Sequence, residues 1–124
     1  MNGTDIFIDT NICIYLLGGD EILAELLQGQ NLFISIITEM ELFAYHSNNS
    51  SSLKTLKTFL EFVTIINIEE KVKIKTIQLR KESKLKLPDC IIAASASAHN
   101  LPLLTADKGF KKVEKLDLIL YANN

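Results

Sequence analysis

Short apolar segments alternate with segments of helical spacing along nearly the whole chain, and this alternation restricts the fold more than any other feature. Apolar runs and period-two alternation predict strands at 5–9, 31–36, 63–67, 102–107 and 116–122. Two of the intervening helical segments, 10–19 and 20–29, end in glycine. Strands that alternate with helices are typical of a parallel sheet covered by helices on both faces. We therefore predict a single α/β domain over residues 1–124, with a central parallel sheet of about five strands.

The second half of the chain adds further helices to this prediction. Helical spacing is present after the second strand in "TEMELFAYH" and again in "LKTLKTFLEF". The polar segment 46–52 between them, "HSNNSSS", reads as a loop. A long helix is expected over 69–84, with Asn67 as its N-cap. His46 and His99 then lie at helix ends, where we expect dipole partners or solvated side chains and assign no catalytic role.

Length and composition agree with one compact domain. A chain of 124 residues with 48% hydrophobic and 23% charged residues can bury an ordinary core. No apolar run approaches the roughly 20 residues that cross a bilayer, and the N-terminus has no signal-peptide pattern. We expect a cytoplasmic protein with no membrane association. In that compartment Cys13 and Cys90 are expected to be reduced and buried.

Charge is distributed unevenly although the net charge is only −2. Residues 1–53 contain seven acids and no Lys or Arg, whereas 54–124 contain all 13 basic residues. Seven of these lie within 71–86: Lys71, Lys73, Lys75, Arg80, Lys81, Lys84 and Lys86. Such asymmetry suits a protein that holds cations on one side and a polyanion on the other. An ordinary solvated helix face explains the same pattern, so composition leaves both interpretations open.

Four acids stand at or just past the carboxyl ends of predicted strands or at helix starts. Asp9 ends the first strand, and Asp107 follows the fourth. Glu41 is expected in the first turn of the helix after the second strand, and Asp89 follows Pro88 at a helix start. The carboxyl ends of parallel strands share one edge of the sheet, where ligands bind in such folds. We therefore expect the four carboxylates to lie together.

Each acid also has a purely structural explanation. Asp9 can cap a helix, Thr38 and Glu41 match a capping box, and Asp89 suits a helix dipole. Asp107 can be a turn residue. Capping does not require all four acids to fall on one edge, however. Carboxylates that converge raise one another's pKa, a conflict that a divalent cation removes. Oxygen ligands without His or Cys favour Mg²⁺ or Mn²⁺, which suits phosphodiester hydrolysis.

The segment 87–98, "LPDCIIAASASA", links this site to the fold. Its run of alanine and serine predicts a helix that approaches the sheet closely, anchored by Ile91 and Ile92. The start of the same helix would hold Asp89 in the cleft. A plain packing helix explains the small residues, but it does not explain the acid.

Several segments resemble the signature regions of PIN-domain ribonucleases, and in particular the VapC-type toxins of toxin–antitoxin pairs. These are "FIDTNICIYLL", "ISIITEMEL", "PDCIIAASASAHNLPLLTAD" and "KGF", in family order over nearly the whole chain. The chain departs from the family in two loops. "FAYHSNNSSS" replaces an aromatic–glycine turn after "MEL", and "KESKLKLPD" lacks the usual glycine. These departures bear on substrate choice more than on the metal site.

The resemblance implies a metal-dependent endoribonuclease. Asp9, Asp89 and Asp107 would bind Mg²⁺ or Mn²⁺, and Glu41 would complete the site as a ligand or by orienting the attacking water. Asn11 and Thr105 would support these acids. The products would carry 5′-phosphate and 3′-hydroxyl ends. The partners implied are an RNA substrate, a second copy of the chain in a homodimer, and a cognate antitoxin that places a basic side chain in the acidic cleft.

Among the basic residues, we select Arg80, Lys81, Lys84 and Lys108 as candidate RNA contacts. A second surface, formed by Leu16, Leu17, Leu23 and Leu27, is either a docking face for a dimer or antitoxin helix, or ordinary core.

Two other functions stay open. A receiver-type signalling domain has a similar sheet and an acidic Mg²⁺ pocket, but this chain lacks its paired acids and its lysine after the last strand. A catalytically silent PIN-like module that binds RNA or protein is the other.

Overall fold

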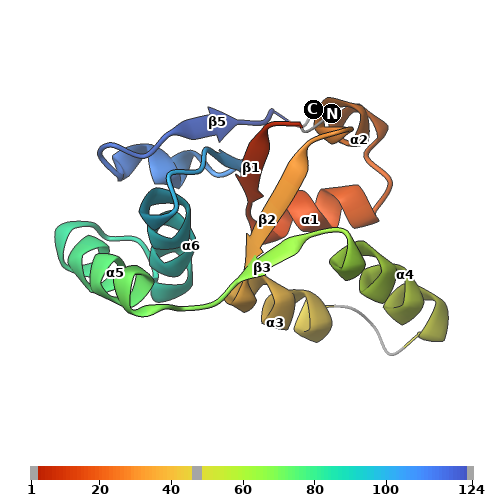
Figure 1. Ribbon diagram of the computed structural model, residues 1–124, viewed down its shortest axis with the longest axis horizontal. Coiled ribbons are helices and arrows are strands. Elements are labelled where there is room, and N and C mark those ends of the chain that lie inside the picture. The colour runs from red at the N-terminus through yellow and green to blue at the C-terminus, as the bar shows by residue number, and fades with distance from the viewer. Residues whose placement is uncertain (1–2, 46–48, 123–124) are drawn as a thin grey trace.

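The computed structural model describes residues 3–45 and 49–122, and a five-stranded sheet forms its centre. The strands are β1 (Asp5–Ile8), β2 (Asn31–Ser35), β3 (Thr64–Ile66), β4 (Leu103–Thr105) and β5 (Leu118–Leu120). Their order is β3-β2-β1-β4-β5, and every neighbouring pair is parallel (Figure 1). The predicted α/β fold with one parallel sheet is therefore confirmed.

Both faces of the sheet are buried, as expected for an all-parallel sheet. Successive side chains of a strand point to opposite faces. Phe7 and its neighbour Leu103 accordingly enter one core, whereas Ile8 and Leu104 enter the other. All four side chains are essentially inaccessible to solvent. This explains why β1 and β4 read as continuous apolar runs rather than as an alternating pattern.

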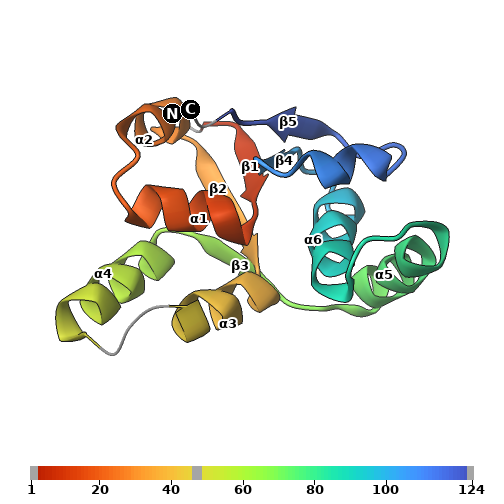
Figure 2. The ribbon, with the colours of Figure 1, turned by 180° about the vertical axis from the view of Figure 1, so that it is seen from behind.

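Helices cover both faces, as predicted (Figures 1 and 2). The core that contains Ile8 is closed by α1 (Thr10–Leu17), α2 (Glu21–Leu27), α3 (Ile36–Tyr45) and α4 (Ser50–Glu61). The core that contains Phe7 is closed by α5 (Glu70–Glu82), α6 (Leu87–Ala98) and the short 3-10 helix η1 (Lys108–Lys112). None of these helices is long and apolar enough to cross a bilayer.

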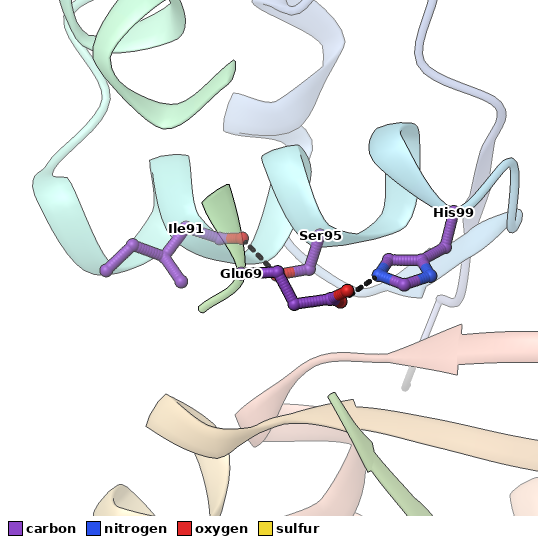
Figure 3. Close-up of polar contacts among 4 residues, drawn as sticks. All are labelled: Glu69, Ile91, Ser95 and His99. Carbon is purple, nitrogen blue, oxygen red and sulfur yellow. Dashed lines mark hydrogen bonds and ion pairs between the residues drawn. The ribbon is translucent and has the colours of Figure 1, made fainter. Parts of the chain in front are cut away.

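Helix α6 packs closely on the sheet, as its small residues predict. Ala93, Ala94 and Ala96 have no exposed surface. Ser95 is equally buried, and its hydroxyl donates to the Ile91 carbonyl one turn earlier at 2.7 Å (Figure 3). A buried hydroxyl satisfied within its own helix adds little bulk and leaves no unpaired donor against the sheet.

The far end of α6 is held by a hydrogen bond between two side chains. His99 is the C-cap residue, and its Nε2 lies 2.8 Å from Oε1 of Glu69, which precedes α5 (Figure 3). The position of His99 at a helix end is as predicted. At 1.5 Å per residue, this end lies roughly 15 Å from Asp89. His46 lies outside the described residues.

Three helix starts differ from their predicted positions. Helix α3 begins at Ile36, because Ser35 accepts a hydrogen bond from the Ile37 backbone N–H at 3.1 Å. Glu41 therefore lies in the second turn of α3, not in the first, and the predicted capping box of Thr38 with Glu41 is wrong. Local capping by a serine at the strand end overrides the later threonine.

Helices α4 and α5 show the same kind of shift. Helix α4 starts at Ser50 because the Asn49 side chain accepts from the N–H groups of Ser51 and Ser52, at 2.8 and 3.2 Å. The end of the predicted loop 46–52 is thus helical, while 46–48 lie outside the described residues. The predicted N-cap of α5 was also wrong: Glu69 occupies that position in place of Asn67.

The leucines proposed as a docking face belong to the core. Leu23 and Leu27 are buried, and Leu16 and Leu17 pack partly buried against the same cluster. The core interpretation is therefore confirmed, and the large apolar residues that α2 exposes are instead Ile22 and Leu26. Cys13 and Cys90 are both free and buried, as predicted.

Candidate metal centre

The sheet reverses its strand order beside β1, which has β2 on one side and β4 on the other. Chains that leave two such strands diverge and open a crevice at their carboxyl ends. Asp9 directly follows β1, and Asp107 comes two residues after β4. The edge of the sheet selected from the sequence is therefore the edge at which the topology opens a crevice.

All four predicted acids line one pocket at this edge. Its volume is about 270 Å³, and polar side chains contribute most of its wall. The lining residues are Asp9, Thr10, Asn11, Ile14, Glu41, Tyr45, Asp89, Ile92 and Asp107. The acids come from four different segments: the β1–α1 junction, the second turn of α3, the first turn of α6 and the turn after β4.

Asp9 is the most buried of the four, with only 4% of its surface exposed. One carboxylate oxygen, Oδ1, accepts the Ile12 backbone N–H at 3.0 Å, so Asp9 is the N-cap of α1. The other, Oδ2, accepts the hydroxyl of Thr105. Thr105 is itself completely buried and accepts the Asp107 backbone N–H at 3.0 Å. One threonine thus connects the acids that follow β1 and β4.

Capping and convergence coexist at two of the acids. Asp9 caps α1, and Asp107 accepts the Gly109 N–H at 2.8 Å as the N-cap of η1. Each also lines the pocket with its carboxylate. The local explanations considered for the sequence are therefore correct for Asp9 and Asp107 without displacing the convergence. The caps instead set the orientation in which each carboxylate meets the crevice.

Burial and mutual repulsion shift the titration of two acids. Burial raises the pKa of Asp9 above its ordinary value, and the nearby charges of Asp107 and Asp89 raise it further. The hydrogen bonds from Thr105 and Ile12 act in the opposite direction and lower this pKa. The pKa of Asp89 is also raised, by burial and then by the charges of Asp107 and Glu41, against a lowering effect of Lys86. Asp9 and Asp89 are therefore both affected by the charges of neighbouring acids in the pocket.

Glu41 is held by a residue that the sequence interpretation did not select. The hydroxyl of Thr10 donates to Glu41 Oε1 at 2.6 Å and lies 3.0 Å from the hydroxyl of Thr38. Thr10 lines the pocket and directly follows Asp9. Its signal in the sequence was a hydroxyl beside a strand-end acid, but its partner lies 31 residues away. Tyr45 also lines the pocket, and no feature of the sequence pointed to it.

The donor chemistry of the pocket fits a hard divalent cation. Its ligand atoms are carboxylate oxygens, with a hydroxyl and a carboxamide beside them, and such sets suit Mg²⁺ or Mn²⁺. Within residues 3–45 and 49–122, no three acidic, His or Cys side chains stand close enough to hold one ion together. Joint coordination therefore requires the acids to rotate toward the pocket centre.

The supporting and basic residues occupy different places. Asn11 is exposed at the pocket wall, and Thr105 lies behind Asp9. The four candidate RNA contacts, Arg80, Lys81, Lys84 and Lys108, are all exposed, and none lines the pocket. Lys86, directly before α6, also lies near the site, because its charge acts to lower the pKa of Asp89.

Fold and pocket together define a class: α/β proteins with an all-parallel sheet and an acidic crevice at the strand-order reversal. Residues 6–116 match the model of the PIN domain. The chain therefore belongs to the PIN-domain family, and the predicted resemblance is confirmed. The receiver-type alternative is wrong, because the strand order β3-β2-β1-β4-β5 differs from the 2-1-3-4-5 order of receiver domains such as CheY.

Solved structures agree with this assignment. VapBC2 from Rickettsia felis, bound to a DNA fragment from its promoter, has a chain 26% identical to this one, with a TM-score of 0.83 and coverage of 96% of this chain and 100% of that chain. A toxin–antitoxin complex from Klebsiella pneumoniae gives 33% identity, a TM-score of 0.80 and coverage of 92% and 95%. DNA-bound VapBC from Salmonella typhimurium, at 21% identity, a TM-score of 0.81 and coverage of 94% and 97%, shows the fold alone. No curated protein matches the sequence significantly.

Proposed function

We propose that this protein is a divalent-metal-dependent endoribonuclease and the toxin of a type II toxin–antitoxin module. One observation carries the proposal: four carboxylates from four separate segments line a single pocket at the strand-order reversal of a PIN domain. Burying acids that raise one another's pKa is costly, and a fold that needed only helix caps would gain nothing from it. A bound cation gives the cluster a use.

The proposed roles follow from burial and orientation. Asp9, Asp89 and Asp107 would hold Mg²⁺ or Mn²⁺, while Glu41 completes the site or orients the attacking water. Thr105 favours the ionised form of Asp9, because its hydroxyl donates to the carboxylate and acts to lower the pKa of that group. Asn11, at the pocket wall, would support the same site. When bound, a divalent cation lowers the pKa of a water molecule and neutralises charge that develops on the phosphodiester.

The substrate class and the products belong to the same proposal. RNA would approach over the basic residues, with Arg80, Lys81, Lys84 and Lys108 as candidate contacts for its phosphates. In-line attack with the 3′ oxygen leaving would give 5′-phosphate and 3′-hydroxyl ends. Such an enzyme would meet its RNA in the cytoplasm.

A cognate antitoxin is the proposed protein partner. Support comes from the structural matches, which are toxin–antitoxin complexes, including one that is 33% identical over 92% of this chain. A basic side chain of the antitoxin would neutralise the acidic pocket in the place of a cation. We also propose that the toxin acts as a homodimer. The exposed apolar residues of its helices provide surface for such contacts.

Cleavage of end-labelled RNA tests the proposed reaction. Wild type and Asp89→Asn are compared with Mn²⁺, with Mg²⁺ and with EDTA. Asp117→Asn, the same chemical change at an exposed position outside the pocket, serves as the matched control. We expect metal-dependent cleavage by wild type and Asp117→Asn, and at least a 100-fold loss for Asp89→Asn.

Equal behaviour of wild type and Asp89→Asn, with or without metal, would contradict the nuclease. RNA binding without cleavage in all proteins would favour the catalytically silent module. The ends of the products give an additional check. An adaptor can be ligated directly to the downstream product only if that product carries the predicted 5′-phosphate.

A further inference from the structure

We infer that Thr10 is a positioning residue for Glu41, and that Thr38 completes a chain of two hydroxyls that fixes this carboxylate in the pocket. The inference deepens the proposed function and rests on it, in the form in which Glu41 completes the site as a ligand of the metal. Thr10 and Thr38 were not among the residues selected for the site from the sequence. Neither residue is an acid, and each acts through a hydroxyl rather than through a charge.

The distances determine the direction of the chain. Thr10 Oγ1 lies 2.6 Å from Glu41 Oε1 and 3.0 Å from Thr38 Oγ1. A threonine hydroxyl has one proton, and the carboxylate can only accept. Thr10 therefore donates to Glu41, and Thr38 must donate to Thr10. Both hydrogen bonds are thus donated in the direction of the Glu41 carboxylate, from Thr38 to Thr10 and from Thr10 to Glu41.

Burial limits the alternative hydrogen-bond partners of these two hydroxyls. Thr38 has 0% exposed surface, so its hydroxyl has no water to replace a lost partner. Thr10 is half-buried at the pocket wall, as the first residue of α1. Hydrogen bonds to an ionised acceptor are stronger than those between neutral groups. The chain thus connects the buried side of α3 to the one acid of that helix that lines the pocket.

The arrangement leaves half of the carboxylate available. The Thr10 bond engages Oε1, and within the described residues no hydrogen bond engages Oε2. A glutamate has three side-chain torsions and loses considerable freedom when a ligand fixes it. A hydroxyl that already holds Oε1 reduces that loss and presents Oε2 to the pocket. Partners of this kind behind a metal ligand typically change metal affinity or activity 10–100-fold.

A purely structural role has to be distinguished from positioning, because the same bonds connect α1 to α3. A link between helices affects the melting temperature, whereas positioning of Glu41 affects metal affinity. Thr76→Val provides the matched control: Thr76 is a buried threonine of α5 whose hydroxyl donates to the Val72 carbonyl at 2.7 Å, away from the pocket.

The test measures Mn²⁺ binding by titration calorimetry together with the melting temperature. We expect Thr10→Val to weaken Mn²⁺ binding about tenfold. Thr10→Ser, which keeps the hydroxyl, should restore most of that affinity, and Thr76→Val should bind as wild type. In a Glu41→Ala background, Thr10→Val should cause no further loss, because its effect passes through Glu41.

The possible results distinguish this inference from the proposed function. Wild-type Mn²⁺ affinity in Thr10→Val, or the same loss in the presence and absence of Glu41, overturns the positioning role even if Asp89→Asn abolishes binding. Failure of the wild type to bind Mn²⁺ at all, with cleavage unaffected by Asp89→Asn, overturns the proposed function and this inference with it. If Thr10→Val unfolds, Thr38→Val interrupts the chain one link earlier and is expected to weaken binding while leaving Glu41 and Thr10 in place.

Discussion

Thr105 connects two of the four acids through a single hydroxyl, which donates to Asp9 and accepts the Asp107 backbone N–H. Its contribution is electrostatic, because Asp9 is buried and its neighbours are also negative. Without this donor, burial and repulsion would raise the pKa of Asp9 further. One uncharged side chain thus helps to keep the most buried acid in the form that can bind a cation.

Thr105→Val should therefore restrict the pH range of metal binding. Loss of the donor raises the pKa of Asp9, so the acid limb of the Mn²⁺ affinity profile should move to higher pH. A hydrogen bond to a charged group is worth about 1.5–3 kcal/mol, so its loss should move the limb by a readily measured amount. Calorimetric titrations from pH 5 to 8 measure the limb. Thr105→Ser keeps the donor and serves as control, and an unmoved limb in Thr105→Val would count against this role.

Some residues of the site could be predicted from the sequence, and others could not. Asp9, Asp89 and Asp107 were predictable because each stands just after a strand or at a helix start, which are local features. Glu41 was also selected, but its expected place in the first turn of α3 was wrong. Their hydroxyl partners were harder to assign. Thr10 meets Glu41 across 31 residues, and Thr105 meets Asp9 across 96 residues. Thr105 was selected only by resemblance to a family, and Thr10 was missed, because hydrogen bonds between distant segments have no local signal.

Among the elements, helix α6 has two tasks, which its middle and its first turn perform separately. Its middle consists of alanines without exposed surface, which let the helix backbone approach the sheet. Its first turn holds Asp89 at the pocket, after Pro88 in the position that suits proline. The small residues therefore determine the depth at which Asp89 enters the crevice.

A larger side chain in the middle of α6 should separate it from the sheet. Ala94→Leu adds three carbon atoms where no space exists, and overpacking of this kind costs about 1–3 kcal/mol. Urea denaturation measures the free energy of unfolding, which we expect to fall by that amount. Ala24→Leu on the exposed face of α2 is the matched control, with an expected change within about 0.5 kcal/mol. A normal unfolding midpoint for Ala94→Leu would show that the contact is not tight.

Element boundaries were the least predictable part of the fold. The types and order of the strands and α-helices were correct because hydrophobic periodicity extends over many residues, whereas the short helix η1 was not predicted. The starts of α3 and α4 were displaced because two or more nearby polar residues can each act as a cap. Helix α5 starts after Glu69, which makes no side-chain capping bond. Ser35 and Asn49 supply the bonds that set the starts of α3 and α4, and the sequence offers no means of ranking them against Thr38 or the serines that follow Asn49.

At the scale of the whole molecule, the parallel sheet is what makes the acidic pocket possible. Segments that are distant in sequence meet because every strand ends at the same edge, and the reversal beside β1 opens space between them. The same arrangement accumulates negative charge in a half-buried crevice. Without a cation, the fold should therefore be less stable at neutral pH than it would be if the same acids were far apart.

Asp89→Asn should reveal this cost. The folded-state pKa of Asp89 is raised above its ordinary value of 3.8, so the folded protein holds this proton more tightly than the unfolded chain does. The penalty is absent below 3.8 and grows as the pH rises through the raised folded-state pKa. In EDTA, the melting temperature of Asp89→Asn should exceed that of wild type by roughly 2–4 °C at pH 7, with little difference near pH 4.

Mn²⁺ should reverse the order, since a ligand at 100 times its dissociation constant stabilises by about 2.7 kcal/mol and only wild type binds it tightly. Asp117→Asn should follow wild type throughout. If Asp89→Asn melts below wild type at pH 7 without metal, Asp89 stabilises the fold as a helix partner and the crevice carries no electrostatic penalty for a cation to relieve.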